Sequence, residues 1–297
     1  MTWEFVARSA ALVCTIALGL SIPAYAQDDM SGDDDPDDVI VVEGQRQVTV
    51  GAMRSQALSI TPRAGSLGEP LARLRREICA GVFGLSPESA RLVIDRIYYN
   101  AERVGLSVAP DEGCIANVVV AIVPDVHAEF QTLRDDRNKL IEGLDYWERK
   151  AVSEQDAPVL AWNAVRTVAY AGGQNGGRGA PVNETTIMGR TNTATQKEIV
   201  VSVVMVNASA LSDVDGVTLA DYATMRALAK TRPPIEDISA PTVLALFSAR
   251  GPAPDRMTVF DRAYLRSLYA GPGNRQARQA MGRLGSNMKQ VMKEGVD

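Results

Sequence analysis

The sequence of 297 residues contains a single histidine and few aromatic residues. One histidine excludes a metal site that needs two imidazole ligands. Aromatic residues make up 5% of the chain, which leaves little material for the stacking platforms that bind single-stranded nucleic acid. The chain carries 36 acidic and 31 basic side chains, so it also lacks the basic excess of nucleic-acid-binding domains. We therefore expect no nucleic-acid partner.

Long apolar runs are scarce, and the clearest one lies at the start of the chain. Arg8 ends a short charged segment, and residues 9–22 that follow carry no charged side chain. This run is shorter than the roughly 18 residues of a membrane span, and Ala-Tyr-Ala at residues 24–26 provides a cleavage site. The sequence therefore predicts a signal peptide over residues 1–26, cut after Ala26, and a periplasmic or secreted protein with no stable membrane span.

Cysteine is also rare, with three in the chain, of which the predicted cleavage removes Cys14. In an oxidising compartment, a disulfide is the expected fate of the remaining two, Cys79 and Cys114. Closing this loop contributes roughly 4 kcal/mol in the chain-entropy estimate. The alternative is a reactive thiol, for which His127 would be the available base.

The segment after the signal peptide is rich in charge and in residues that interrupt regular structure. Seven aspartates lie within residues 27–38, and such a composition cannot bury enough apolar surface to fold. Glycine and proline are scattered through residues 47–70, which favours a linker. We expect a disordered acidic leader and linker over residues 27–70, and then a single domain over residues 71–290 with a helical C-terminal third.

Within this leader, residues 39–46 read Val-Ile-Val-Val-Glu-Gly-Gln-Arg. They resemble the TonB box of outer-membrane TonB-dependent receptors, which adds a strand to the edge of its partner's sheet. The resemblance implies TonB contact through residues 39–46, and a linker strand is the alternative. The rest of the chain departs from that family, because it lacks the many alternating strands of a receptor barrel.

Apolar periodicity and capping residues predict the elements of the domain. Strands are predicted over residues 73–83, 117–123, 158–170 and 197–207. Helices are predicted over residues 86–104, 125–144, 218–230 and 258–270, with a short helix from Ser239. Capping boxes at Thr218–Asp221 and Thr258–Asp261 support two of these helices. The pattern predicts an α+β fold in which helices pack a small mixed sheet.

Two further segments, residues 172–179 and 274–294, are rich in glycine and in basic residues, respectively. The glycine cluster over residues 172–179 lacks the Lys-Ser/Thr ending of a phosphate-binding loop, so we expect a mobile hairpin loop within the polar stretch 172–196. Residues 274–294 carry five basic side chains above a thin apolar face. A membrane or partner surface could attract such a helix, but the pattern favours a solvated, partly frayed one.

Three stretches resemble a family of secreted alphaproteobacterial proteins of unknown function, namely residues 78–85 with Gly113–Cys114, residues 218–229 and residues 243–269. The resemblance covers residues 70–285 and implies no catalytic residues. The order of elements is similar to that of zincin-type metallopeptidases, which implies a degenerate zincin-like scaffold.

In a zincin, the helix that follows residues 197–207 would carry two histidines one turn apart and a glutamate base. This helix offers Asp221, Tyr222 and Met225 instead. We therefore expect no zinc chemistry, no metal and no cofactor.

Other catalytic patterns are absent or ambiguous. His127 has no Gly-x-Ser-x-Gly serine to activate. Asp221, Glu236, Asp237 and Asp261 are best interpreted as caps, turn residues and solvated charges, and no pair of carboxylates stands out.

Two functions remain open. The first is a non-catalytic periplasmic module that binds a protein or peptide partner. The second is a metal-independent hydrolase that acts on peptides or envelope glycans through carboxylates. An exposed strand edge or a smooth apolar groove would favour the binding module, whereas an open cleft with a desolvated carboxylate pair would favour the hydrolase.

Overall fold

The computed structural model describes residues 39–40, 48–62, 68–110, 113–155, 158–170, 192–235, 238–248 and 253–295. The predicted signal peptide, the aspartate-rich segment, the glycine cluster, Glu236 and Asp237 lie outside these residues. Of the TonB-like segment, Val39–Ile40 (β1) pairs antiparallel with Val48–Thr49 (β2), and residues 41–46 lie outside the described part. Contact of residues 39–46 with TonB stays a prediction.

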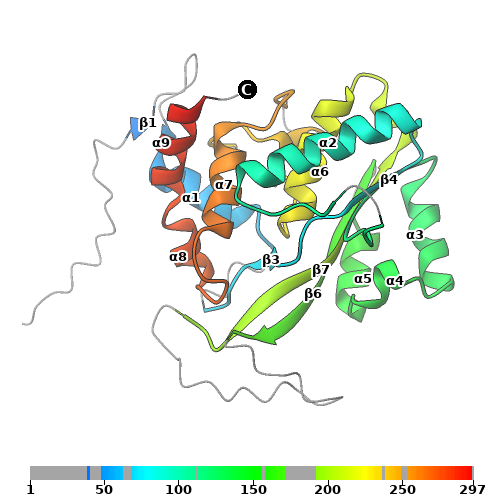
Figure 1. Ribbon diagram of the computed structural model, residues 1–297, viewed down its shortest axis with the longest axis horizontal. Helices are drawn as coiled ribbons and strands as arrows, with labels where there is room; N and C mark the ends of the chain where they lie inside the picture. Colours follow the sequence, from blue (N-terminus) through cyan, green and yellow to red (C-terminus); the bar gives the residue numbers. More distant parts are fainter. Residues whose placement is uncertain are drawn as a thin grey trace, which may run out of the picture. The chain divides into compact units, whose positions relative to one another are not determined.

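A five-stranded sheet organises the fold (Figure 1). Its longest strand, β7 (Thr195–Asn207), pairs in parallel with β3 (Ala72–Leu74) through its first half and with β5 (Val118–Val123) through its second half. β4 (Ala80–Phe83) adds to β5 in parallel. On the other side of β7, β6 (Val159–Ala169) runs antiparallel along its whole length. The predicted mixed sheet packed by helices is confirmed, and most of its strands are parallel.

Helices cover both faces of this sheet, which explains the continuous apolar sequence of β5: its residues alternate between two cores. The face with the larger core is covered by α1 (Val50–Ser59), α2 (Pro87–Arg103), α6 (Gly216–Leu228), α7 (Val259–Tyr269), α8 (Ala277–Met281) and α9 (Leu284–Glu294). The opposite face is covered by α3 (Val126–Asp135), α4 (Lys139–Glu142) and α5 (Tyr146–Ser153). Every residue of α6 from Thr218 onward is buried, so α6 is the central helix of the larger core.

Local sequence signals fix several helix ends. The Ser86 side chain caps α2 by accepting the Ser89 N–H, as predicted. The turn before it requires Gly84, because φ is +81° and a Cβ there would lie 2.0 Å from the Ile122 oxygen. The capping box predicted at Thr258–Asp261 is confirmed at the start of α7.

The capping box predicted at Thr218–Asp221 is wrong. α6 begins at Gly216, and the Asp215 side chain caps it by accepting the Thr218 N–H at 2.8 Å. The Thr218 hydroxyl instead donates to the Asp255 carbonyl at 2.8 Å. Asp215 is therefore the N-cap of α6, and the Thr218 hydroxyl makes a tertiary hydrogen bond instead.

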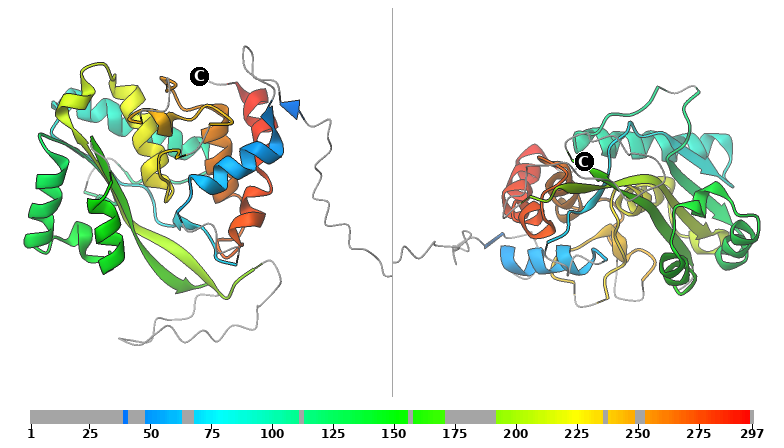
Figure 2. Two further views of the ribbon diagram at one scale, coloured as in Figure 1. Left: turned by 180° about the vertical axis from the view of Figure 1, so that it is seen from behind. Right: turned by 90° about the horizontal axis from the view of Figure 1, so that it is seen from below.

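Two segments are more ordered than the sequence predicts. The linker expected over residues 47–70 contains α1, whose Met53 and Ala57 are buried in the larger core. The C-terminal helix expected to be solvated is α9, which packs beside α7 and α1 (Figure 2). Its residues Leu284, Met288 and Val291 are buried in the larger core. In α9 these apolar residues lie three or four positions apart and form a narrow stripe between basic residues. The stripe is wide enough to pack against the core.

Two predicted helices are shorter than expected. The helix predicted over residues 125–144 is divided into α3 and α4, because Arg137 adopts a φ of +50° and Asn138 caps a new helix. The helix predicted from Ser239 is reduced to one 3₁₀ turn, Val243–Ala245 (η2), which Thr242 caps.

The predicted disulfide is confirmed between Cys79 and Cys114, whose Cα atoms lie 6.1 Å apart. It ties the residue before β4 to the loop that leads into β5. Because both sulfurs are bonded, the reactive-thiol alternative is wrong for this structure. His127 lies exposed in the first turn of α3.

Candidate functional site

Two adjoining pockets of about 300 and 320 Å³ border β6. The first extends from β6 across Lys197 of β7 to Ala72 of β3, and the second is lined by Gln155 where its side chain bonds to β6. Both are lined by Pro62, Glu148 and Lys230, so we treat them as one feature and call it the edge cleft. The first pocket is also lined by Val165 and Thr167 of β6. The second is also lined by β6 residues Ala161, Trp162 and Asn163.

The walls of the edge cleft come from both helical layers. One wall is the start of α5 with the turn before it. Gly143 allows this turn to approach the strand, since a Cβ there would lie 2.8 Å from the Ala164 Cβ. The other wall consists of the segments that follow α1 and α6. Lys230 Nζ reaches across to Glu148 Oε1 at 2.7 Å, at the place that the two pockets share.

Helix α5 is absent from the helices predicted above, although its first residues carry a capping signal. The Asp145 side chain accepts a hydrogen bond from the Glu148 N–H at 2.7 Å. The Glu148 side chain accepts one from the Asp145 N–H at 3.2 Å. This is a capping box in which aspartate takes the place of serine or threonine. Recognising it would have placed Asp145 and Glu148 at a helix start, but not at a cleft.

The outer edge of β6 has no strand partner in the described part of the chain. The Asn207 N–H donates to the Pro158 carbonyl, and in an antiparallel ladder every second residue faces its partner. Residues Ala161 and Asn163 therefore direct their backbone N–H and C=O away from β7. At the far end the Tyr170 N–H donates to the Ala194 carbonyl, and the same alternation turns Thr167 outward.

One side chain already occupies a position on this edge. The Gln155 carboxamide accepts from the Ala161 N–H at 3.0 Å and donates to the Ala161 carbonyl at 2.9 Å. These are the two bonds that one residue of an added antiparallel strand would make with its own N–H and C=O. The outward N–H and C=O of Ala161 are therefore placed to pair with one residue of an extended chain, and Gln155 occupies that position.

Beside Gln155 lies a buried positive charge, Arg226, in the last turn of α6. This residue is 4% exposed and lines the second pocket. One guanidinium nitrogen donates to the Tyr222 hydroxyl at 3.0 Å, and another makes long contacts with Gln155 Oε1 and the Ala161 carbonyl at 3.3 and 3.4 Å. Its Nε–H has no hydrogen-bond partner, and no carboxylate of the described residues lies within 4.0 Å.

The sheet fixes the position of this arginine by holding the end of α6. The Ser202 hydroxyl donates to the Ala227 carbonyl at 2.7 Å, and Asn163 Nδ2 donates to the Arg226 carbonyl at 3.1 Å. Side chains of β6 and β7 thus replace the hydrogen bonds that the final helix carbonyls lack. The sequence does not predict these contacts, because Ser202 and Asn163 lie within strands whose other residues are mostly apolar.

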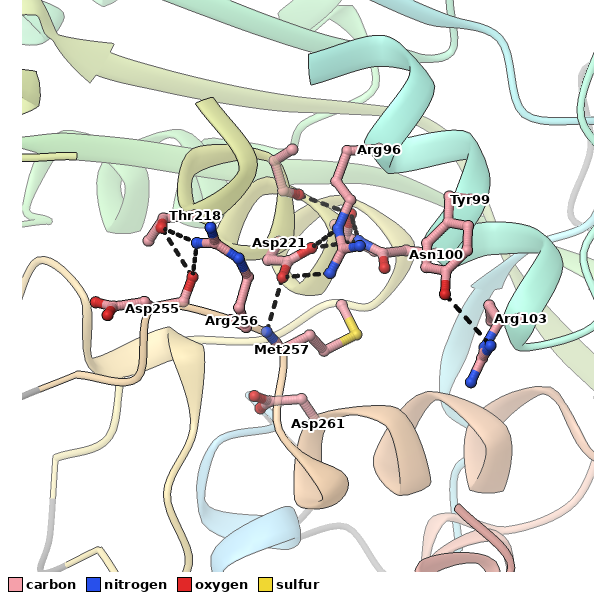
Figure 3. A network of polar contacts seen from close by, with 12 residues as sticks. Arg96, Tyr99, Asn100, Arg103, Thr218, Asp221, Asp255, Arg256, Met257 and Asp261 are labelled. Carbon is pink, nitrogen blue, oxygen red and sulfur yellow. Dashed lines mark hydrogen bonds and ion pairs between the residues drawn. The ribbon is translucent and has the colours of Figure 1, made fainter. Parts of the chain in front are cut away.

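Asp221, singled out in the sequence at the zincin active-site position, lies in a network away from the edge cleft (Figure 3). Its Oδ1 accepts from Arg96 Nε and Asn100 Nδ2, both at 2.7 Å. Its Oδ2 accepts from Arg96 Nη2 at 3.0 Å and the Met257 N–H at 2.8 Å. Asp221 is fully buried, and it joins α6 to α2 and to the segment before α7.

Tyr222 and Met225, which follow Asp221 on the same helix, are both buried in the larger core. Met225 contributes to apolar packing. The Tyr222 ring packs edge-on against Phe247, while its hydroxyl accepts from Arg226. Of the three residues, Tyr222 alone reaches the edge cleft, and it does so through Arg226.

Asp261 is a second fully buried carboxylate and has a structural position. Its Oδ1 contacts the Thr242 hydroxyl at 2.5 Å. Its Oδ2 accepts from the Val243 N–H at 2.9 Å and from the N–H and hydroxyl of Thr258 at 3.0 and 2.9 Å. Burial raises the pKa of the Asp261 carboxyl from 3.8 to about 6, against the opposing effect of these hydrogen bonds.

The carboxylates that line the edge cleft have partners. Asp145 caps α5, Glu148 pairs with Lys230, and Glu69 pairs with Lys197. Among the described residues, no group of three or more His, Cys, Asp or Glu side chains is placed to hold a metal ion. No described helix is long and apolar enough to cross a membrane.

Comparisons with protein-family models, with curated proteins and with solved structures find no match for this chain. Function therefore has to follow from the geometry of the edge cleft.

Proposed function

We propose that the chain is a non-catalytic binding module that takes up an extended peptide segment along the outer edge of β6. The observation that carries this proposal is the pair of hydrogen bonds between the Gln155 carboxamide and the Ala161 backbone, since one residue of an added antiparallel strand makes the same pair with its own N–H and C=O. Of the further outward residues, Asn163 lines the second pocket, and Val165 and Thr167 line the first. Backbone bonds would supply affinity, and the pockets would supply specificity.

The surface beside the edge cleft supports a peptide or protein partner. Tyr146 and Trp147, in the first turn of α5, are 71% and 65% exposed. Their rings pack edge to face at 5.1 Å. Tyrosine and tryptophan are enriched where proteins bind one another, because they bury large areas at low entropic cost. A strand edge without a strand partner in the described part of the chain, next to exposed aromatic residues, is the combination that favours a binding module.

The hydrolase alternative receives less support. Asp221 and Asp261 are engaged in structural networks, and Asp145, Glu148 and Glu69 are held in caps and ion pairs. The likeness in element order to zincin-type peptidases supports a peptide cleft beside α6, where Tyr222 and Arg226 lie one turn apart. The Cys79–Cys114 disulfide supports an oxidising compartment such as the periplasm. We propose that binding takes place there.

Replacing Thr167 with proline tests the use of the strand edge. Proline would remove an N–H that faces away from β7, and its ring would obstruct an added strand, whereas Thr167→Ala keeps the N–H and removes the same hydroxyl. The test is retention of a random octapeptide mixture by the immobilised chain 27–297, with bound peptides quantified by mass spectrometry. We expect Thr167→Pro to retain about tenfold less peptide, and Thr167→Ala to match the unchanged protein within about twofold.

Thermal unfolding of both variants shows whether each still folds. If folded Thr167→Pro retains as much peptide as Thr167→Ala, the peptide does not bind at this edge and the proposal is wrong.

A further inference from the structure

We infer that the edge cleft selects the carboxyl-terminal end of its peptide, with the terminal carboxylate against Arg226 and an apolar last side chain in the second pocket. This inference rests on the proposed function and adds which part of a peptide is recognised. Three observations carry it: a buried charge without a counter-ion, a strand edge that is closed at one point, and an apolar pocket beside both.

The charge observation concerns the basic residues that line the second pocket, which are Arg226, Lys230 and Arg232, against the single acidic residue Glu148. Glu148 is paired with Lys230. The Arg232 Nε donates to the Ser59 carbonyl at 2.8 Å, a neutral partner. Arg226 is buried, yet its contacts within the described residues are neutral oxygens, and its Nε–H makes none. Burying a guanidinium without a carboxylate is costly, so the site is suited to a ligand that brings one.

The closed edge determines where the bound peptide ends. Because Gln155 occupies the outward groups of Ala161, an added strand can pair at Thr167 and Asn163 but not beyond. The end of such a strand lies next to Arg226, whose guanidinium also contacts Gln155 and the Ala161 carbonyl. A positive site at that position favours the carboxyl end over the amino end. The peptide therefore runs antiparallel to β6, and about seven residues pair with residues 163–169.

The second pocket determines the last side chain. Beside Arg226 its lining includes the apolar side chains of Leu144, Ala151, Val152 and Trp162. A volume of about 320 Å³ accommodates one large side chain. We therefore expect an aliphatic or aromatic residue at the end of the peptide, immediately before the carboxylate.

The test compares two forms of one random octapeptide mixture, prepared with a free C-terminal carboxylate and as C-terminal amides. Both are offered to the unchanged chain 27–297, and the retained peptides are sequenced by mass spectrometry. We expect retention of the free acids to exceed that of the amides by about tenfold or more, with apolar residues enriched at the last position. This comparison needs no variant and so does not depend on whether a substitution folds.

Variants then identify the group that reads the carboxylate. Arg226→Met should retain acids and amides alike, and Arg226→Lys should keep part of the preference because it keeps the charge. Arg134→Met is the matched control, since Arg134 lies exposed on α3, outside the pairing edge, and does not line either pocket. It should keep the full preference for acids.

The outcomes separate this inference from the proposed function. Equal retention of acids and amides, with loss on Thr167→Pro, would overturn carboxylate recognition and leave strand-edge binding in place. Equal retention together with enrichment of internal Asp or Glu would show that Arg226 reads an acidic side chain, which also overturns the inference. Retention of neither form would overturn both proposals.

Discussion

Asp221→Asn lowers the free energy of unfolding by about 3–5 kcal/mol, which is the usual cost of breaking a buried ion pair. Asp221 has no exposed surface, and its partner Arg96 is 16% exposed. Each carboxylate oxygen of Asp221 accepts two hydrogen bonds. In either orientation of the asparagine amide, its NH₂ would face two donors and lose both hydrogen bonds. The substitution also removes the negative charge opposite Arg96. Denaturant unfolding measures the effect.

Asp255→Asn is the matched control for this prediction, because it makes the same chemical change nearby on an exposed side chain. It should change the free energy of unfolding by less than about 0.5 kcal/mol. A similar small effect for Asp221→Asn would mean that the network around Asp221 does not hold α2 against α6, contrary to the structure.

Asp261 should make the protein less stable as pH rises from about 4 to 6, opposite to the usual effect of a carboxylate. Its pKa is about 6 in the folded chain and 3.8 when unperturbed, so the folded chain binds more protons in this interval. The free energy of unfolding falls with pH wherever the folded state holds the extra proton. The difference in pKa corresponds to about 3 kcal/mol, at about 1.36 kcal/mol for each pH unit.

Asp261→Asn should remove this pH dependence and still fold. The amide oxygen can replace Oδ2, which accepts three bonds, while the NH₂ can donate to the Thr242 hydroxyl that contacts Oδ1. Unfolding measured from pH 4 to 7 should show variant and unchanged protein with similar stability at pH 4. The variant should then become more stable by about 3 kcal/mol at pH 7. Parallel curves would show that the Asp261 pKa is not raised.

These two aspartates show what sequence could and could not predict. Both begin as acidic residues in helical segments with capping patterns, and the capping box at Asp261 was predicted correctly. The sequence places Asp221 in a capping box, on the helix at the zincin active-site position, and indicates no catalytic role for it. Its partner Arg96 lies 125 residues away, and no local pattern reports a contact at that separation. The role of Asp221 follows from tertiary packing alone.

Dependence on tertiary contacts also explains why the edge cleft could not be predicted from the sequence. The strand around residues 158–170 was predicted from its apolar run, but its position at the edge of the sheet depends on which strands pair with β7. Gln155 and Arg226 become neighbours because the end of α6 lies across β6. Composition and periodicity predict the disulfide, the main strands and the starts of α2, α3 and α7, since these depend on residues close in sequence. The edge cleft depends on residues that only the fold brings together.

Residue-resolved amide hydrogen exchange of β6, with and without an octapeptide retained in the selection, tests the central claim most directly. Strand addition predicts that the outward amides of Asn163 and Thr167 exchange at least about tenfold more slowly in the complex. The amides of Trp162 and Arg166, which the ladder alternation directs at β7, should change less and serve as internal controls. Unchanged exchange at Asn163 and Thr167 with saturating peptide would contradict binding along this edge.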